Sequence, residues 1–158
     1  MKLRSGFSMI TALFMIIMMA TVAAFVLSLS GKIIKSTTAQ YQREQAMLLA
    51  KSYTEYAVLA VMSNDRNGTG SCLHTIHGTI GDDPNSGNGY RATVQINYIG
   101  NTQEVGNCGG VDNRILSSSV INAKSPLSII VDTYIDYKDI DNATAAWLTY
   151  HKRTLQKI

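Results

Sequence analysis

Charge is missing from one long stretch of this sequence. No Asp, Glu, Lys or Arg occurs from Ser5 to Gly31, whereas the rest of the chain is polar and rich in Asn, Thr, Ser, Gly and Tyr. A stretch this long and apolar is typical of a helix that crosses a membrane. The 158 residues leave room for one globular domain and not two.

Catalytic signatures are also missing. The sequence contains no G-x-S-x-G, H-E-x-x-H or phosphate-loop pattern. An anchored enzyme is therefore the least favoured class, and no cofactor is expected.

The excess of basic residues is small once the N-terminus is set apart. Of the 14 Lys and Arg residues, Lys2 and Arg4 precede the apolar stretch, and the remaining 12 face 11 Asp and Glu. A nearly neutral remainder gives no argument for a phosphate-binding surface, so no nucleic-acid partner is expected. His151, Lys152 and Arg153 near the C-terminus are interpreted as a basic strand edge that resists aggregation, with a DNA contact as the alternative.

Only two cysteines occur, Cys72 and Cys108, and both follow the apolar stretch. An even pair in an exported domain predicts one disulfide, and closing such a loop is worth about 3–4 kcal/mol. His74 and His77 lie nearby, but the paired spacing of zinc ligands is absent. We therefore expect a disulfide and no metal.

Residues 7–29 predict a transmembrane helix. At 1.5 Å per residue such a helix spans about 30 Å, the thickness of a hydrocarbon core. The apolar region is too long for a cleaved secretory signal, and no turn follows it. Basic residues flank it on both sides, so charge does not fix its orientation. The cysteines favour an exported C-terminal domain.

The N-terminal sequence MKLRSG|FSMITALF resembles a type IV prepilin leader: a short basic peptide, a Gly, and a Phe that heads the apolar helix. In that family a membrane peptidase cuts after the Gly on the cytoplasmic side and methylates the new N-terminus. The resemblance covers about residues 1–60 and implies processing between Gly6 and Phe7. The mature chain would keep its anchor, since the cut precedes the helix.

The sequence departs from the family at Thr11, the fifth residue after the implied cut. Most type IV pilins have a Glu there, whose carboxylate is thought to neutralise the amine of a neighbouring subunit. A buried charge is costly unless it is paired, and Thr11 offers no such charge. This chain therefore resembles the minor subunits without the Glu, which are proposed to initiate or cap a fibre.

The helix is predicted to continue from Lys32 to Met62, a segment without proline or internal glycine, and to end near Ser63. It could be partly unwound at Gly31. A stripe at helical spacing predicts the face that packs on the domain: Ala46, Leu49, Ala50, Tyr53, Ala57 and Val61.

Four strands are predicted after a loop-like region between Asn64 and Asn88. They are 90–99, where alternation is strictest, then about 115–121, 127–137 and 145–155. Short loops between consecutive strands predict an antiparallel sheet. The expected fold is α+β, with a long N-terminal helix packed on a small sheet of about four strands. Its expected parts are a leader (1–6), an assembly helix (7–31), its exposed continuation (32–62) and a globular domain (63–158).

Two weaker site hypotheses remain. Asp136, Asp139 and Asp141 are candidate Ca²⁺ ligands, although their spacing is not that of a calcium loop and such residues are common in hairpins. Asn67 lies in an N-x-T acceptor that resembles an extended bacterial glycosylation site, with a simple turn as the favoured interpretation.

The resemblance implies a minor pilin or a pseudopilin of type II secretion, single-pass in a bacterial inner membrane with a periplasmic domain, and able to enter a surface pilus. Its partners would be the prepilin peptidase, other pilin or pseudopilin subunits and the inner-membrane assembly platform. The alternative is a signal-anchored exported binding module that does not polymerise and keeps residues 1–6.

Overall fold

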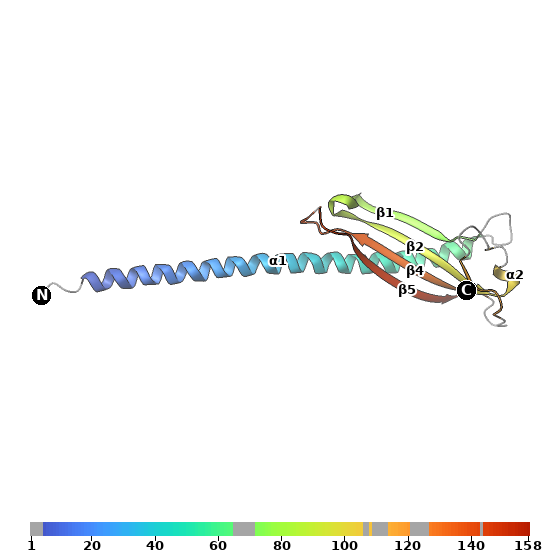
Figure 1. Cartoon of the computed structure of the whole chain (residues 1–158), viewed down its shortest axis with the longest axis horizontal. Coiled ribbons are helices and arrows are strands. Elements are labelled where there is room, and N and C mark those ends of the chain that lie inside the picture. The colour runs from blue at the N-terminus through green and yellow to red at the C-terminus, as the bar shows by residue number, and fades with distance from the viewer. Residues whose placement is uncertain (1–4, 65–71, 106–107, 109–113, 121–126, 143) are drawn as a thin grey trace. The chain divides into compact units, whose positions relative to one another are not determined.

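The computed structural model describes residues 5–64, 72–105, 108, 114–120, 127–142 and 144–158. The architecture is α+β, as expected, with one long N-terminal helix and a small antiparallel sheet (Figure 1). The helices are α1 (Ser5–Ser63), the 3-10 helix η1 (Pro84–Ser86) and α2 (Thr102–Val105). The strands are β1 (Thr75–Asp83), β2 (Asn88–Gly100), β3 (Ile115–Ser117), β4 (Leu127–Tyr137) and β5 (Leu148–Lys157).

Helix α1 is continuous, so the suggestion that it unwinds at Gly31 is wrong. One glycine costs a helix about 1 kcal/mol relative to alanine, which the hydrogen bonds of a long helix on both sides offset. The helix ends at Ser63, as predicted, and the Ser63 hydroxyl donates to the Ala60 carbonyl at 3.0 Å. The chain forms two compact units, residues 1–42 and 43–158, and α1 contributes to both.

The sheet belongs to the second unit and has the strand order β1-β2-β4-β5. All three pairings along this path are antiparallel. The longest joins β2 to β4, from Tyr90 opposite Tyr137 to Gly100 opposite Leu127. The short strand β3 pairs with β2 in parallel, off the main path. Among the described residues the sheet therefore has five strands. Three of the four predicted strands, β2, β4 and β5, lie on the antiparallel path, whereas the strand predicted near 115–121, β3, pairs in parallel, so its expected antiparallel pairing is wrong.

The main error of the sequence prediction lies at β1, because the region between Asn64 and Asn88 was expected to be loop-like. Instead Thr75–Asp83 forms a nine-residue strand on β2. Gly78 and Gly81 lower its intrinsic strand preference, and tertiary pairing with β2 overrides that preference. The predicted strand at 115–121 is also shorter than expected, and β5 begins three residues later than predicted.

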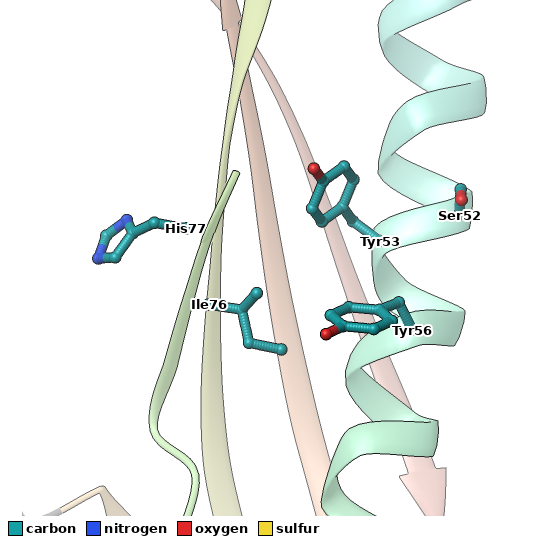
Figure 2. Close-up of a pocket in the computed structure, with 5 residues that line it drawn as sticks. All are labelled: Ser52, Tyr53, Tyr56, Ile76 and His77. Atoms are coloured by element: carbon teal, nitrogen blue, oxygen red, sulfur yellow. The ribbon is translucent and has the colours of Figure 1, made fainter. Parts of the chain in front are cut away.

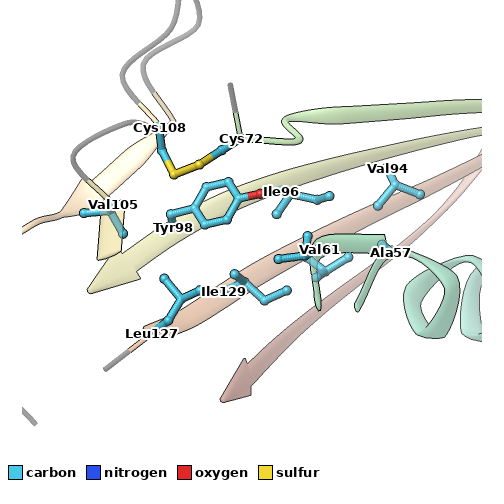
Figure 3. Packing of buried hydrophobic residues seen from close by; sticks show 11 residues of the cluster. Ala57, Val61, Cys72, Val94, Ile96, Tyr98, Val105, Cys108, Leu127 and Ile129 are labelled. Atoms are coloured by element: carbon cyan, nitrogen blue, oxygen red, sulfur yellow. A yellow bond between two sulfur atoms is a disulfide. The ribbon is translucent and has the colours of Figure 1, made fainter. Parts of the chain in front are cut away.

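The predicted stripe of α1 packs on one face of the sheet. Ala46, Ala50, Ala57 and Val61 are fully buried, and Leu49 and Tyr53 are partly buried against the same core. The three alanines let the helix backbone approach the strands closely. The helix covers alternate residues of β2 and β4. One cluster contains the cysteines together with Val94, Ile96, Tyr98, Leu127, Ile129 and Val131 (Figure 3), and a second contains Ala92 and Ile135.

Polar groups between helix and sheet are paired. The buried Thr54 hydroxyl lies 2.7 Å from the Ala50 carbonyl, to which it donates, and 3.0 Å from the Thr133 hydroxyl of β4. Nearer Arg43, the Tyr90 hydroxyl donates to the Gln45 side-chain carbonyl at 2.8 Å. A buried polar group without a partner is costly, so these pairs help to fix the position of the helix on the sheet.

At Gly78, β1 lies directly against the Tyr53 side chain of α1. A Cβ atom at this position would overlap the hydroxyl group and ring of Tyr53. A larger residue here would therefore have to displace the Tyr53 side chain. The neighbours of Gly78 on the same side of β1, Ile76 and Ile80, also pack against the core clusters.

Candidate functional site

The first candidate region is the uncharged part of α1 in the first unit. Its large side chains are exposed, from Met9 at 79% to Leu29 at 44%. Of the described helices, α1 alone is long and apolar enough to cross a membrane. Its Thr21 hydroxyl donates to the Met18 carbonyl at 2.8 Å, so this polar group is satisfied within the helix. The segment is suited to membrane anchoring.

The residues predicted for processing and assembly all lie in this helix. Gly6 and Phe7 fall within its first turns, and Thr11 lies one turn further along, on its exposed surface. The helix thus carries an uncharged residue at the position where the resemblance implies a carboxylate.

The second candidate region is the end of the sheet that carries the disulfide. Cys72 and Cys108 are bonded, as predicted, with their Cα atoms 4.8 Å apart. Both are almost completely buried beside Tyr98, whose hydroxyl donates to the Leu73 carbonyl at 2.6 Å (Figure 3). The bond ties the segment after α1 to the segment after β2.

Two of the three predicted calcium ligands, Asp136 and Asp139, accept hydrogen bonds through their carboxylates. Asp136 accepts from the Thr149 hydroxyl at 2.6 Å, and Asp139 accepts from the Asp141 backbone N–H at 3.0 Å. Among the described residues, no three His, Cys, Asp or Glu side chains are grouped so that they could hold a metal ion. Asn67, the candidate glycosylation residue, lies outside the described residues.

The two histidines near Cys72 do not converge on one site. The His74 ring meets the Tyr98 ring edge-on, with centroids 6.1 Å apart. His77 lies in β1, and its Nδ1 atom is 3.5 Å from the Thr93 hydroxyl. Its side chain points away from the helix (Figure 2).

The third candidate region is a polar cluster on the outer face of the sheet, the face turned away from α1. Asp132 of β4 is only 2% exposed, although it lies on this face. Arg153 of β5 donates to Asp132 through Nε at 2.7 Å and through Nη2 at 3.0 Å. The His151 Nε2 atom lies 2.8 Å from the same carboxylate, and its ring stacks on Tyr134 with centroids 4.5 Å apart.

The environment of Asp132 shifts its acidity. Burial by itself raises the pKa of the carboxyl, but the hydrogen bonds and charges of Arg153 and His151 outweigh it, so the pKa lies below the ordinary 3.8. The same contact raises the pKa of Arg153. Asp132 and Arg153 therefore form an ion pair at neutral pH.

This cluster was not predicted from the sequence, although His151 and Arg153 were noted as basic residues. Their partner could be found only from the register, which places Asp132 opposite Arg153 and Tyr134 opposite His151. The available signal was Asp132, an acid that directly follows the apolar residues Ile129–Val131.

A second carboxylate with a shifted pKa lies at the turn after β1. Asp83 caps η1 by accepting from the Asn85 backbone N–H at 3.0 Å, and this bond lowers the pKa of Asp83. Gly87 ends the same turn with a φ of 87°, a conformation that favours glycine. The Asp83 carboxylate therefore stabilises this turn.

Comparisons of this chain with protein-family models, curated proteins and solved structures find no match.

Proposed function

We propose that this chain is a non-enzymatic minor pilin or pseudopilin, a membrane-anchored subunit that initiates, caps or modifies a type IV pilus or a secretion pseudopilus. The observation that carries the proposal is the dual character of α1. Its first part is uncharged and exposed, and its last part, from Arg43, packs through an alanine-rich face on an antiparallel sheet. The same helix thus contains a membrane-anchor segment and a segment that packs on the globular domain.

The N-terminal sequence supports the same proposal. The basic leader and the Gly6–Phe7 junction provide a prepilin peptidase with its cleavage point ahead of the helix. The anchor would then be available to other subunits, which would pack against it through its small residues, such as Ala20, Ala23 and Ala24. The assembly platform of a bacterial inner membrane would be the further partner.

The disulfide supports export of the globular domain. Disulfides persist in oxidising compartments such as the bacterial periplasm. The proposed orientation therefore places the sheet in the periplasm and residues 1–6 in the cytoplasm.

The deciding experiment is N-terminal sequencing and intact-mass measurement of the protein purified from its native membrane. We expect a chain that begins at Phe7 and is heavier by one methyl group. Gly6→Ala should leave the full precursor, whereas Ser5→Ala, the matched control, should be processed normally.

Other N-termini would reject the proposal. A wild-type chain that keeps Met1 would identify a signal-anchored binding module, and a chain that begins near Lys32 would identify a secreted domain. Normal processing of Gly6→Ala would show that the Gly6–Phe7 junction is not the cleavage point.

A further inference from the structure

The two outer strands of the main sheet path, β1 and β5, are long. They contain nine and ten residues, and each pairs with a described strand on one side only (Figure 1). An edge strand offers a row of backbone N–H and C=O groups to any extended segment beside it. These edges are therefore potential sites of strand addition.

The topology makes the two edges complementary. Since β1, β2, β4 and β5 alternate in direction, β1 and β5 run opposite to one another. When two copies lie side by side in the same orientation, β5 of one copy meets β1 of the next in antiparallel fashion. In this arrangement the α1 helices of the two copies point in the same direction. Two copies anchored in the same membrane must have this parallel orientation.

The charges of the two edges are also complementary. β5 contains Lys152, Arg153 and Lys157 but no acid, whereas β1 contains Asp82 and Asp83 but no Lys or Arg. Pairing of β5 with another β5 would bring like charges together, which is unfavourable.

Lys152 indicates which part of β5 would face an acid of the neighbouring copy. It lies opposite Thr133, a residue of the helix-facing side of the sheet, so Lys152 is on that side too. A lysine on this side of an edge strand opposes pairing with a neutral strand and favours a partner that carries an acid.

Grooves on the helix side adjoin both edges. Along β1, one of about 440 Å³ lies between Tyr56 and Ile76 (Figure 2), and one of about 280 Å³ lies between Leu48 and Ile80. Along β5, a groove of about 300 Å³ is bounded by Leu59, Met62 and Gln156. Joining the two edges would bring apolar side chains of neighbouring copies together, which favours association.

We infer that β5 of one copy pairs antiparallel with β1 of a second copy, in the register that brings Lys152 to the irregularity between Gly81 and Asp83, beside Asp82. This register places Thr154 opposite Ile80 and Gln156 opposite Gly78. The inference deepens the proposed function and rests on it, because an edge contact holds neighbours together without the carboxylate that Thr11 replaces.

The register also staggers the copies. Within one copy, Thr75, Gln95, Asp132 and Arg153 form one row across the sheet. Between copies, Arg153 lies opposite Gly81, six residues from Thr75. At about 3.4 Å per residue, the copies are displaced by about 20 Å along the strands. Each further copy that joins through the same contact is therefore displaced by the same distance in the same direction.

The test is disulfide cross-linking between full-length copies in their native cells. One copy carries Ile80→Cys and the other Thr154→Cys, because residues directly opposite across antiparallel strands have Cβ atoms about 5 Å apart. We expect a cross-linked dimer only when both are present. Thr79→Cys, on the other face of β1, is the matched control and should not cross-link with Thr154→Cys.

Charge reversal tests the register. Asp82→Lys in the Ile80→Cys copy, or Lys152→Asp in the Thr154→Cys copy, should lower cross-linking by up to about fivefold, because like charges would then lie close together across the two strands. Both changes together should restore it. Peptide mapping of the intact Cys72–Cys108 bond verifies that each variant folds.

The outcomes separate this inference from the proposed function. Absence of the cross-link, or equal cross-linking through Thr79→Cys, in a protein that begins at Phe7 would overturn the edge contact and leave the subunit class standing. A charge-dependent cross-link in a protein that keeps Met1 would establish the contact and reject the pilin-like processing.

Discussion

Asp132 is held by Arg153 through a pair of hydrogen bonds across neighbouring strands, from Nε at 2.7 Å and from Nη2 at 3.0 Å. The carboxylate is nearly inaccessible, whereas the arginine side chain is 65% exposed. The interaction thus joins β4 to the edge strand β5 on the face of the sheet that α1 does not cover. Such charge-assisted pairs are stronger than neutral hydrogen bonds.

Replacing Asp132 with Asn should destabilise the globular unit. The substitution keeps the shape but removes the charge that Arg153 and His151 face, and loss of such bonds costs about 1–3 kcal/mol. Urea unfolding of the full chain in detergent, followed by circular dichroism of the sheet, measures the change. Asp136→Asn is the control and should cost less, because Asp136 accepts a hydrogen bond from the neutral Thr149 hydroxyl. An unchanged urea midpoint for Asp132→Asn would mean that the cluster contributes no stability.

Stability should decrease on acidification. The pKa of Asp132 is lowered in the folded state, so its contribution is present above the ordinary value of 3.8 and is lost as pH falls through the folded value. Urea midpoints of the wild type should therefore fall below about pH 4, and those of Asp132→Asn should fall less steeply. Parallel curves for the two proteins would contradict this assignment. Asp83→Asn should remove a separate part of the pH dependence of the urea midpoint, since the pKa of Asp83 is lowered as well.

Removing the disulfide should destabilise the protein strongly. Cys72 and Cys108 are separated by 36 residues, and opening a loop of that length costs about 3–4 kcal/mol in the chain-entropy model. The double replacement Cys72→Ala and Cys108→Ala should lower the free energy of unfolding by about that amount. The reduced wild type, with its thiols blocked, provides an independent comparison. Equal stability of oxidised and reduced protein would contradict the prediction.

Gly78→Ala should disturb the packing of α1 on β1. The new methyl group would overlap the Tyr53 hydroxyl, and accommodating such overpacking costs about 1–3 kcal/mol. Tyr53→Phe in the same chain should recover part of the loss, because it removes the nearest atom. Thr79→Ala, an exposed neighbour on the other face, is the control. A Gly78→Ala protein as stable as the wild type would show that Tyr53 moves away without cost.

The elements with strong local patterns were predicted best. β4 begins and ends at the predicted residues, since Pro126 precedes a run of alternating apolar residues from Leu127 to Tyr137. The buried stripe of α1 from Ala46 to Val61 was also predicted, because helical spacing and alanine content indicate the same face.

The missed features depend on contacts between distant segments. β1 carries two glycines in its first seven residues and gains its strand structure from β2. The Asp132 cluster depends on the register of β4 with β5, which no local pattern specifies. The apolar helix and the cysteine pair could be predicted because composition alone indicates them.

The disulfide also determines how the chain would respond to a stretching force. If the two ends of the chain were pulled apart, tension arriving at Cys72 would pass through the covalent bond directly to Cys108. β1, β2 and α2, which lie between the two cysteines, would be outside the path of the load. Some 36 residues, about 120 Å of extended chain, could not be drawn out until the bond was reduced. The central strand β2 is therefore protected from mechanical unravelling while the disulfide is intact.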